Sequence, residues 1–310
     1  MWKRVASWAI KLALTAGSIA YLVHKVDLSA AWEAGKNLSP WYCLAALLLQ
    51  LVQVAICALR WKAVLHAIRA KMPFLHAARL FMIGNFFGQI LPGAVGGDAV
   101  RIVATRRAGL DLAHSINSVM LERAATLYAL FLLTTLAEPA LLQRLADAPG
   151  RWLFPGLTFG ATCGLVFLAE LDRLPLSWRR WKLVRGFVQL AADTRACFLK
   201  LRNAVPLLSI ALFGHVNLAV LMWVLAIGIG APAGLVDCLV LVPPVILVAT
   251  LPISIAGWGA REVAMITVFG LIGVPAAQAT AMSVLFGLST MLIALPGGVL
   301  FLLERKQIRG

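Results

Sequence analysis

Apolar residues run through this chain in long stretches, unlike the short alternating pattern of a soluble protein. A helix needs roughly 20 predominantly apolar residues to cross a bilayer. Six runs meet that requirement: 5–23, 41–60, 113–137, 152–171, 204–230 and 276–303. We therefore predict an all-α polytopic membrane protein with six full spans, of which the first is an uncleaved helix.

Two further apolar regions, 74–112 and 236–273, are interrupted by proline and glycine. The apolar pieces within them are shorter than a full span, so we predict that each region forms a re-entrant hairpin of two broken helices. Segment 176–202 combines basic and apolar residues, which is typical of an amphipathic helix lying in the membrane interface. Tryptophans near the ends of the runs, Trp61 among them, are interpreted as interfacial anchors.

The two interrupted regions resemble each other. In both, a Leu-Pro pair precedes a glycine-rich turn and then an arginine, at an offset of about half the chain. The same offset carries run 41–60 onto 204–230 and run 113–137 onto 276–303. We interpret residues 1–310 as a single transmembrane domain of two repeats, 1–150 and 151–310, each with the order helix, helix, hairpin, helix.

Basic residues are concentrated in alternate loops. Most of the 28 Lys and Arg residues lie in segments 1–4, 60–73, 102–112, 173–203 and 304–310. By the positive-inside rule, these segments and both termini are expected on the cytoplasmic side of a bacterial inner membrane. The first repeat then starts inside and the second outside, so we predict an inverted repeat, a design that many secondary transporters share.

The composition narrows the function classes. The chain is 61% hydrophobic, 13% charged and carries a net charge of +15. Because the basic residues lie between apolar runs, we expect a membrane surface and no nucleic acid as the partner. The sequence contains no nucleotide-binding loop, zinc-protease helix or nucleophile elbow, and its five cysteines form no C-x-x-C pair. We therefore expect no enzymatic activity, no metal and no cofactor.

The tips of the two hairpins carry the candidate chemistry. Each tip directs backbone N–H groups and the positive end of a helix dipole into the membrane, and each has an arginine beside it. We expect Arg101 and Arg261 to face one water-accessible chamber near mid-membrane and to bind a phosphate or carboxylate. The candidate substrate-binding residues are Asn85, Gly96, Gly97, Asp98, Arg101, Glu122, Arg123, Ser254, Gly257, Trp258, Gly259, Arg261 and Glu262.

Structural explanations exist for several of these residues. Asp98 and Glu262 are also suited to capping the helices that follow them, where the dipole favours an acid. Glu122 lies within run 113–137 and is equally an internal partner for Arg101 or Arg261. Asn85 either binds a ligand or caps the broken helix.

The motifs resemble, in combination, the flippase-like integral membrane family that includes the transmembrane domain of bacterial lysylphosphatidylglycerol synthases. The residues that carry the resemblance are Asn85, Leu91, Pro92, Gly96, Gly97, Asp98, Arg101, Glu122, Arg123, Leu251, Pro252, Ser254, Gly257, Gly259, Arg261 and Glu262. The resemblance implies movement of a lipid between leaflets without an ATPase. We expect a stand-alone member without the synthase domain, so lysylphosphatidylglycerol is not assigned as the substrate.

The leading hypothesis is a flippase for an anionic or zwitterionic lipid or glycolipid, whose head group binds at the hairpin tips and buried arginines. One alternative is an ion-coupled transporter of small solutes, with Asp98, Glu122 and Glu262 as proton carriers. The other is an accessory protein that binds a lipid within a glycosyltransferase system. A membrane lipid is the expected partner, a lipid-modifying enzyme or glycosyltransferase is a candidate partner, and oligomerisation is left open.

Overall fold

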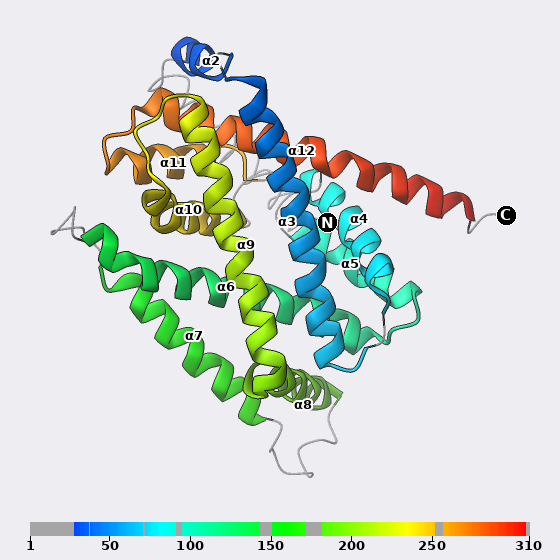
Figure 1. Ribbon diagram of the computed structural model, residues 1–310. Coiled ribbons are helices and arrows are strands. Elements are labelled where there is room, and N and C mark those ends of the chain that lie inside the picture. Colours follow the sequence, from blue (N-terminus) through cyan, green and yellow to red (C-terminus); the bar gives the residue numbers. More distant parts are fainter. Residues whose placement is uncertain are drawn as a thin grey trace, which may run out of the picture. The chain divides into compact units, whose positions relative to one another are not determined.

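The computed structural model describes residues 28–36, 38–70, 72–90, 95–142, 151–171, 182–251 and 257–307, and this part of the chain is helical without a β-strand (Figure 1). The helices are α2 (Leu28–Lys36), α3 (Pro40–Ala67), α4 (Phe74–Ile90), α5 (Val95–Arg107), α6 (Leu112–Leu142), α7 (Leu153–Glu170), α8 (Lys182–Thr194), α9 (Leu201–Gly228), α10 (Leu235–Thr250), α11 (Ala260–Gly270) and α12 (Ala276–Gln307). A π-helical turn, η3 (Arg195–Leu199), separates α8 from α9. The predicted all-α fold class is confirmed.

Five of the described helices are long and apolar enough to cross a membrane: α3, α6, α7, α9 and α12. The most apolar of these five helices are α3 and α9. In hydrocarbon a helix satisfies its backbone polar groups internally, which is why such runs form single uninterrupted helices. Five of the six predicted spans are thus confirmed as helices, and the sixth, 5–23, lies outside the described residues.

Four shorter helices occupy the two interrupted regions. Helices α4 and α5 contain 17 and 13 residues, and α10 and α11 contain 16 and 11. All four are shorter than the roughly 20 residues that a full span needs. The links 91–94 and 252–256, which include Ser254, lie outside the described residues. The broken helices are therefore confirmed, whereas their re-entry and the inverted repeat stay predictions.

Glycine sets the packing of α4 against α5. A Cβ added to Gly97 of α5 would overlap the carbonyl group of Gly84 and lie 3.2 Å from the Cα of Gly88, both on α4. The two backbones thus approach so closely that Gly97 has no room for a side chain, as at small-residue contacts between membrane helices.

The described residues divide into two compact units. Those within 1–54, 82–100 and 216–310 form the first unit, and those within 55–81 and 101–215 form the second. Helices α3, α4, α5 and α9 contribute residues to both. In the first unit α12 packs against α2 and α11, and α10 packs against α11.

The second unit contains a buried apolar cluster from α3, α6, η3 and α9. Its members are Val64, Ala67, Ile68, Leu121, Ala125, Cys197 and Leu207. Helix α7 packs against both α6 and α8, and it diverges from α6 along its length (Figure 1). This cluster positions the part of α6 that carries the first group of candidate residues.

Helix α8 covers the central part of the predicted segment 176–202, with Phe187 exposed and Ala191 buried, and its place in the membrane interface stays a prediction. The buried Asp193 joins it to α6, because its carboxylate accepts hydrogen bonds from Asn117 of α6 at 2.7 Å and from Gln189 at 3.0 Å. Burial raises the pKa of Asp193, although these two hydrogen bonds oppose the shift.

Candidate functional site

Glu122 lies between two buried arginines from different helices. Arg60 Nε of α3 donates to Glu122 Oε1 at 2.7 Å, and Arg101 Nη1 of α5 donates to Glu122 Oε2 at 3.1 Å. All three side chains are buried: the exposed fraction is 6% for Arg60, 3% for Arg101 and 2% for Glu122. We call these three residues the Glu122 cluster. All of them belong to the second unit.

Two aromatic rings of the same unit hold the Arg101 guanidinium. Its Cζ lies 4.2 Å from the ring centroid of Trp61 and 5.0 Å from that of Phe81. The indole of Trp61 is fully buried and its Nε1 donates to the hydroxyl of Ser118 at 3.3 Å. A guanidinium over aromatic faces gains cation–π attraction while its edge stays available for hydrogen bonds.

The structure corrects two expectations about the end of α3. The sequence predicts that the segment between spans begins at Arg60, but α3 continues to Ala67 and buries Arg60 against Glu122. It also predicts that Trp61 is an interfacial anchor, but Trp61 packs on Arg101 inside the unit. The signal in the sequence was the apolar stripe that continues through Val64 and Ile68, because a residue four positions before Val64 lies on the same helix face.

Glu262 organises a second group of buried side chains, in the first unit. Arg261 Nη2 donates to Glu262 Oε1 at 2.9 Å, and Arg261 Nε donates to the hydroxyl of Ser283 at 2.9 Å. That hydroxyl in turn donates to Glu262 Oε1 at 2.7 Å, and the backbone N–H of Gly259 donates to Glu262 Oε2. We call Trp258, Arg261, Glu262, Ser283 and Phe286 the Glu262 cluster.

Aromatic rings also flank Arg261. Its Cζ lies 4.8 Å from the ring centroid of Trp258 and 5.3 Å from that of Phe286. Gly257 and Gly259 have φ values of 80° and 82°, which favour glycine and allow the tight turn that starts α11. The predicted glycine turn before Arg261 is thus confirmed, and so is the interpretation of Glu262 as the cap of α11.

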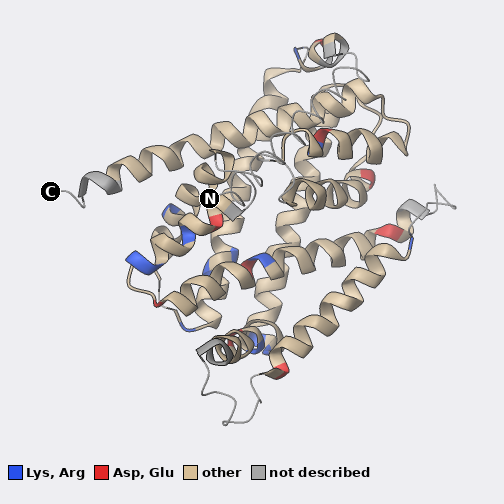
Figure 2. Ribbon diagram, turned by 180° about the vertical axis from the view of Figure 1, so that it is seen from behind, with Lys and Arg blue, Asp and Glu red and all other residues tan. Residues whose placement is uncertain are grey.

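The two clusters share one design. In each, an arginine of the second short helix of a pair forms an ion pair with a glutamate and contacts the rings of a tryptophan and a phenylalanine. Figure 2 shows where the basic and acidic residues lie along the ribbon, most of which is neutral. Each cluster lies within its own unit, and the chamber expected between Arg101 and Arg261 stays a prediction.

The other predicted site residues have separate positions. Glu122 and its neighbour Arg123 face different sides of α6, and Arg123 is half-buried. Gly96 and Asp98 are half-buried in the first turn of α5, and Asn85 is half-buried on α4. The interpretation of Glu122 as an internal partner of Arg101 is confirmed by their contact at 3.1 Å.

Sequence reasoning missed the side chains that complete the clusters, namely Arg60, Trp61, Phe81, Ser283 and Phe286. Arg60 is remote in the chain from Glu122, and the other four are remote from the arginines that they contact, so their spacing along the chain does not indicate these contacts. Within the described part of the chain, no group of three or more His, Cys, Asp or Glu residues is arranged to hold a metal ion. In both clusters, guanidinium and carboxylate groups form an ion pair beside aromatic rings.

Comparison with known proteins agrees with this arrangement. The family model described as the lysylphosphatidylglycerol synthase TM region matches residues 8–298, nearly the whole chain. No curated protein matches the chain in sequence. With its apolar helices, its two pairs of short helices and its match along nearly the full length, the chain belongs to the lysylphosphatidylglycerol synthase transmembrane-region family of membrane proteins.

Proposed function

We propose that this protein is a flippase that moves an anionic or zwitterionic lipid or glycolipid between the leaflets of a bacterial inner membrane. The observation that supports it most directly is the Glu122 cluster, in which two guanidinium groups are buried against one carboxylate among apolar helices. Membership of a family named after a lipid-modifying synthase supports a lipid as the substrate class.

The cost of these buried charges supports a functional role. An arginine at the centre of a bilayer costs about 3 kcal/mol or more, and such residues usually face a cavity or an internal partner. Glu122 divides its two oxygens between Arg60 and Arg101. The Glu122 cluster thus contains two guanidinium groups and one carboxylate. A phosphate group matches that excess of positive charge.

The proposed binding step is an exchange of partners. A guanidinium presents a planar fork of donors that fits a carboxylate or a phosphate equally well. Trp61 and Phe81 hold the guanidinium plane of Arg101 in place. Meanwhile the N–H groups at the edge of that plane exchange the carboxylate of Glu122 for the head group of the lipid. The acyl chains stay in the bilayer throughout. Movement of one inverted repeat against the other would then expose the head group to the opposite leaflet.

The Glu122 and Glu262 clusters count against a proton-coupled transporter of small solutes. Such a transporter needs a carboxylate that is free to exchange protons with water, whereas Glu122 and Glu262 are buried and their oxygens accept hydrogen bonds from arginines. An accessory protein that binds lipid without moving it would use the same arginines, so only a transport measurement separates it from a flippase.

The test is reconstitution of the full chain into liposomes that carry traces of fluorescent phosphatidylglycerol, phosphatidylethanolamine or a glycolipid. Bleaching by external dithionite measures how fast each lipid crosses. We expect the protein to accelerate at least one lipid and Arg101→Gln to slow that lipid about tenfold or more, because one charge-assisted hydrogen bond is worth about 1.5–3 kcal/mol.

Arg106→Gln is the matched control, since Arg106 lies on the same helix but is exposed. We expect it to retain most of the wild-type rate. Equal rates in both variants would remove Arg101 from the mechanism. Binding of a lipid without accelerated crossing would favour the accessory protein, and uptake of a small solute driven by a pH gradient would favour the transporter.

A further inference from the structure

A cavity of about 570 Å³ lies where α3 ends and α4 begins, in the second unit. Its lining consists of Lys62, His66, Arg69, Ala70, Met72 and Pro73. None of these residues belongs to the Glu122 cluster. Arg60 of that cluster and its neighbour Trp61 are both buried on the same helix. The cavity is therefore a separate feature of α3.

Basic side chains form one wall of this cavity. Lys62 and His66 are four residues apart and therefore lie on one face of α3. Arg69 follows in the turn after α3, where its φ is 61°. Among the residues that the structure describes, none of the three forms an ion pair. The sequence also contains no Asp or Glu between Glu33 and Asp98. The lining is thus basic without a carboxylate to offset it.

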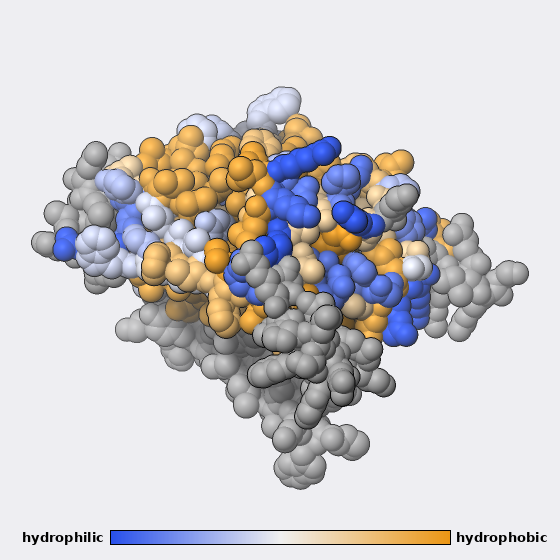
Figure 3. All heavy atoms as spheres, turned by 90° about the horizontal axis from the view of Figure 1, so that it is seen from below, coloured by the Kyte–Doolittle hydropathy of each residue, from blue (hydrophilic) through white to orange (hydrophobic). Residues whose placement is uncertain are grey.

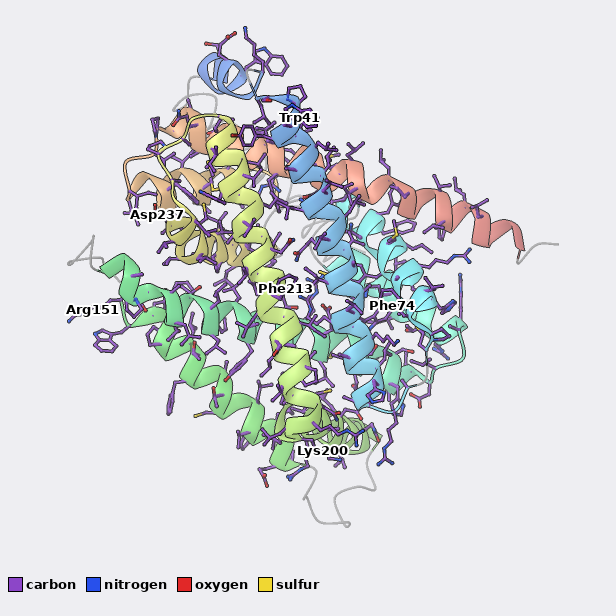
Figure 4. The ribbon with its side chains drawn as sticks, viewed as in Figure 1. Trp41, Phe74, Arg151, Lys200, Phe213 and Asp237 are labelled. Atoms are coloured by element: carbon purple, nitrogen blue, oxygen red, sulfur yellow. The ribbon has the colours of Figure 1, made fainter. Side chains whose placement is uncertain are left out.

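Apolar groups complete the cavity. Ala70, Met72 and Pro73 belong to its lining, and Met72 is buried. The ammonium of Lys62 lies 5.7 Å from the ring centroid of Phe74, which Figure 4 labels at the beginning of α4. The next residue, Leu75, is 81% exposed. On the face seen from below, Figure 3 shows hydrophilic surface directly beside apolar surface.

The dipole of α3 explains only part of this arrangement. Cations near the last turn of a helix are favoured by its negative end, which accounts for basic residues at this position. It does not account for a cavity that combines them with apolar groups at the end of a candidate membrane span. An anion attached to an apolar body fits both kinds of wall, and basic pockets beside membrane helices are suited to anionic lipid head groups.

We propose that this cavity binds the phosphate group of an anionic phospholipid. Lys62 and Arg69 contact the phosphate oxygens, while Ala70, Met72 and Pro73 contact the adjoining glycerol. Free phosphate presents the same oxygens but would leave the apolar wall in water, so we assign the lipid as the source. The site is distinct from the Glu122 cluster, and its occupancy does not depend on whether the protein moves lipids.

The test is lipid binding to the full chain in detergent micelles, measured by native mass spectrometry. The probes are short-chain phosphatidylglycerol, short-chain phosphatidylcholine as the lipid of zero net charge, and inorganic phosphate. The pocket variant is Lys62→Gln/Arg69→Gln. The matched control is Arg106→Gln/Arg107→Gln, which removes the same charge from exposed positions at the end of α5.

We expect phosphatidylglycerol to bind about tenfold more tightly than phosphatidylcholine, and the pocket variant to lose about tenfold in affinity for phosphatidylglycerol while the control stays near wild type. Equal losses in both variants would show a diffuse basic surface and overturn the proposal. Inorganic phosphate that binds as tightly as phosphatidylglycerol, with the same dependence on Lys62 and Arg69, would overturn the assignment to a lipid. Unchanged helicity by circular dichroism ensures that a lost affinity reflects the cavity.

Discussion

Replacement of Glu122 by glutamine tests whether the two buried arginines depend on this carboxylate. The glutamine has nearly the same shape and still offers an oxygen to Arg60, but it removes the negative charge. Arg60 and Arg101 would then remain buried, at 6% and 3% side-chain exposure, without the charge that both contact. The substitution thus isolates the electrostatic part of the cluster.

The expected loss follows from the geometry. Unit charges 4 Å apart interact by about 4 kcal/mol at an effective dielectric constant of 20, and removing one partner of a buried ion pair typically costs about 3–5 kcal/mol. Because the amide keeps one hydrogen bond, we expect Glu122→Gln to lower the free energy of unfolding by about 3 kcal/mol. That is more than a hundredfold change in the unfolding equilibrium.

Cys197 provides the assay. It is fully buried in the apolar cluster that also contains Leu121, the neighbour of Glu122. In a chain whose other cysteines are replaced by alanine, labelling of Cys197 by a maleimide during titration with sodium dodecyl sulfate reports the opening of this unit. The midpoint and slope of the titration give the free energy of unfolding.

Glu170→Gln is the matched control. Glu170 pairs with Arg195 at 3.1 Å, but these side chains are 39% and 25% exposed. A partly exposed pair contributes about 0–1 kcal/mol, so the control should change the titration little. A loss below about 1 kcal/mol for Glu122→Gln, or equal losses in both variants, would refute the claim that the Glu122 cluster is a dehydrated ion-pair network.

Three further outcomes are expected. Glu262→Gln should lower the free energy of unfolding by about 3 kcal/mol in the same detergent titration, because the charge opposite its arginine is lost while an amide oxygen can still accept from Gly259. Burial raises the pKa of Asp193 above the ordinary 3.8, so its ionised form opposes folding. The free energy of unfolding should therefore fall as the pH rises from about 4 through the raised pKa. Detergent titrations at several pH values should show that Asp193→Asn removes this pH dependence. Burial also raises the pKa of the Cys197 thiol to about 12, so in the folded protein maleimide at pH 8 should modify the exposed Cys43 and leave Cys197 unlabelled, as peptide mapping would show.

Apolar run length was sufficient to predict the spanning helices, because a helix in hydrocarbon depends mainly on its own sequence. Proline and glycine likewise marked the two regions where the helices become short. The pairing of Arg101 with Glu122 was also accessible, since a charged residue within an apolar run requires an internal partner.

The remainder of the site depends on tertiary packing. Arg60 contacts Glu122 from a different helix, and Phe81 reaches Arg101 from α4. The positive-inside rule places Arg60 in a loop because Arg60 is a cation near the end of an apolar run. The rule does not indicate that α3 continues for another seven residues, with Arg60 on its buried face.

The carboxylate of Glu262 divides its work between two oxygens. One accepts the backbone N–H of Gly259 and so anchors the beginning of α11, while the other receives the Arg261 guanidinium and the Ser283 hydroxyl. An anion that took Arg261 from Glu262 would remove only one of the two hydrogen bonds to the second oxygen, because the Ser283 hydroxyl would still donate to it. The hydrogen bond from Gly259 would remain, so Arg261 can bind another anion while the turn that starts α11 stays intact.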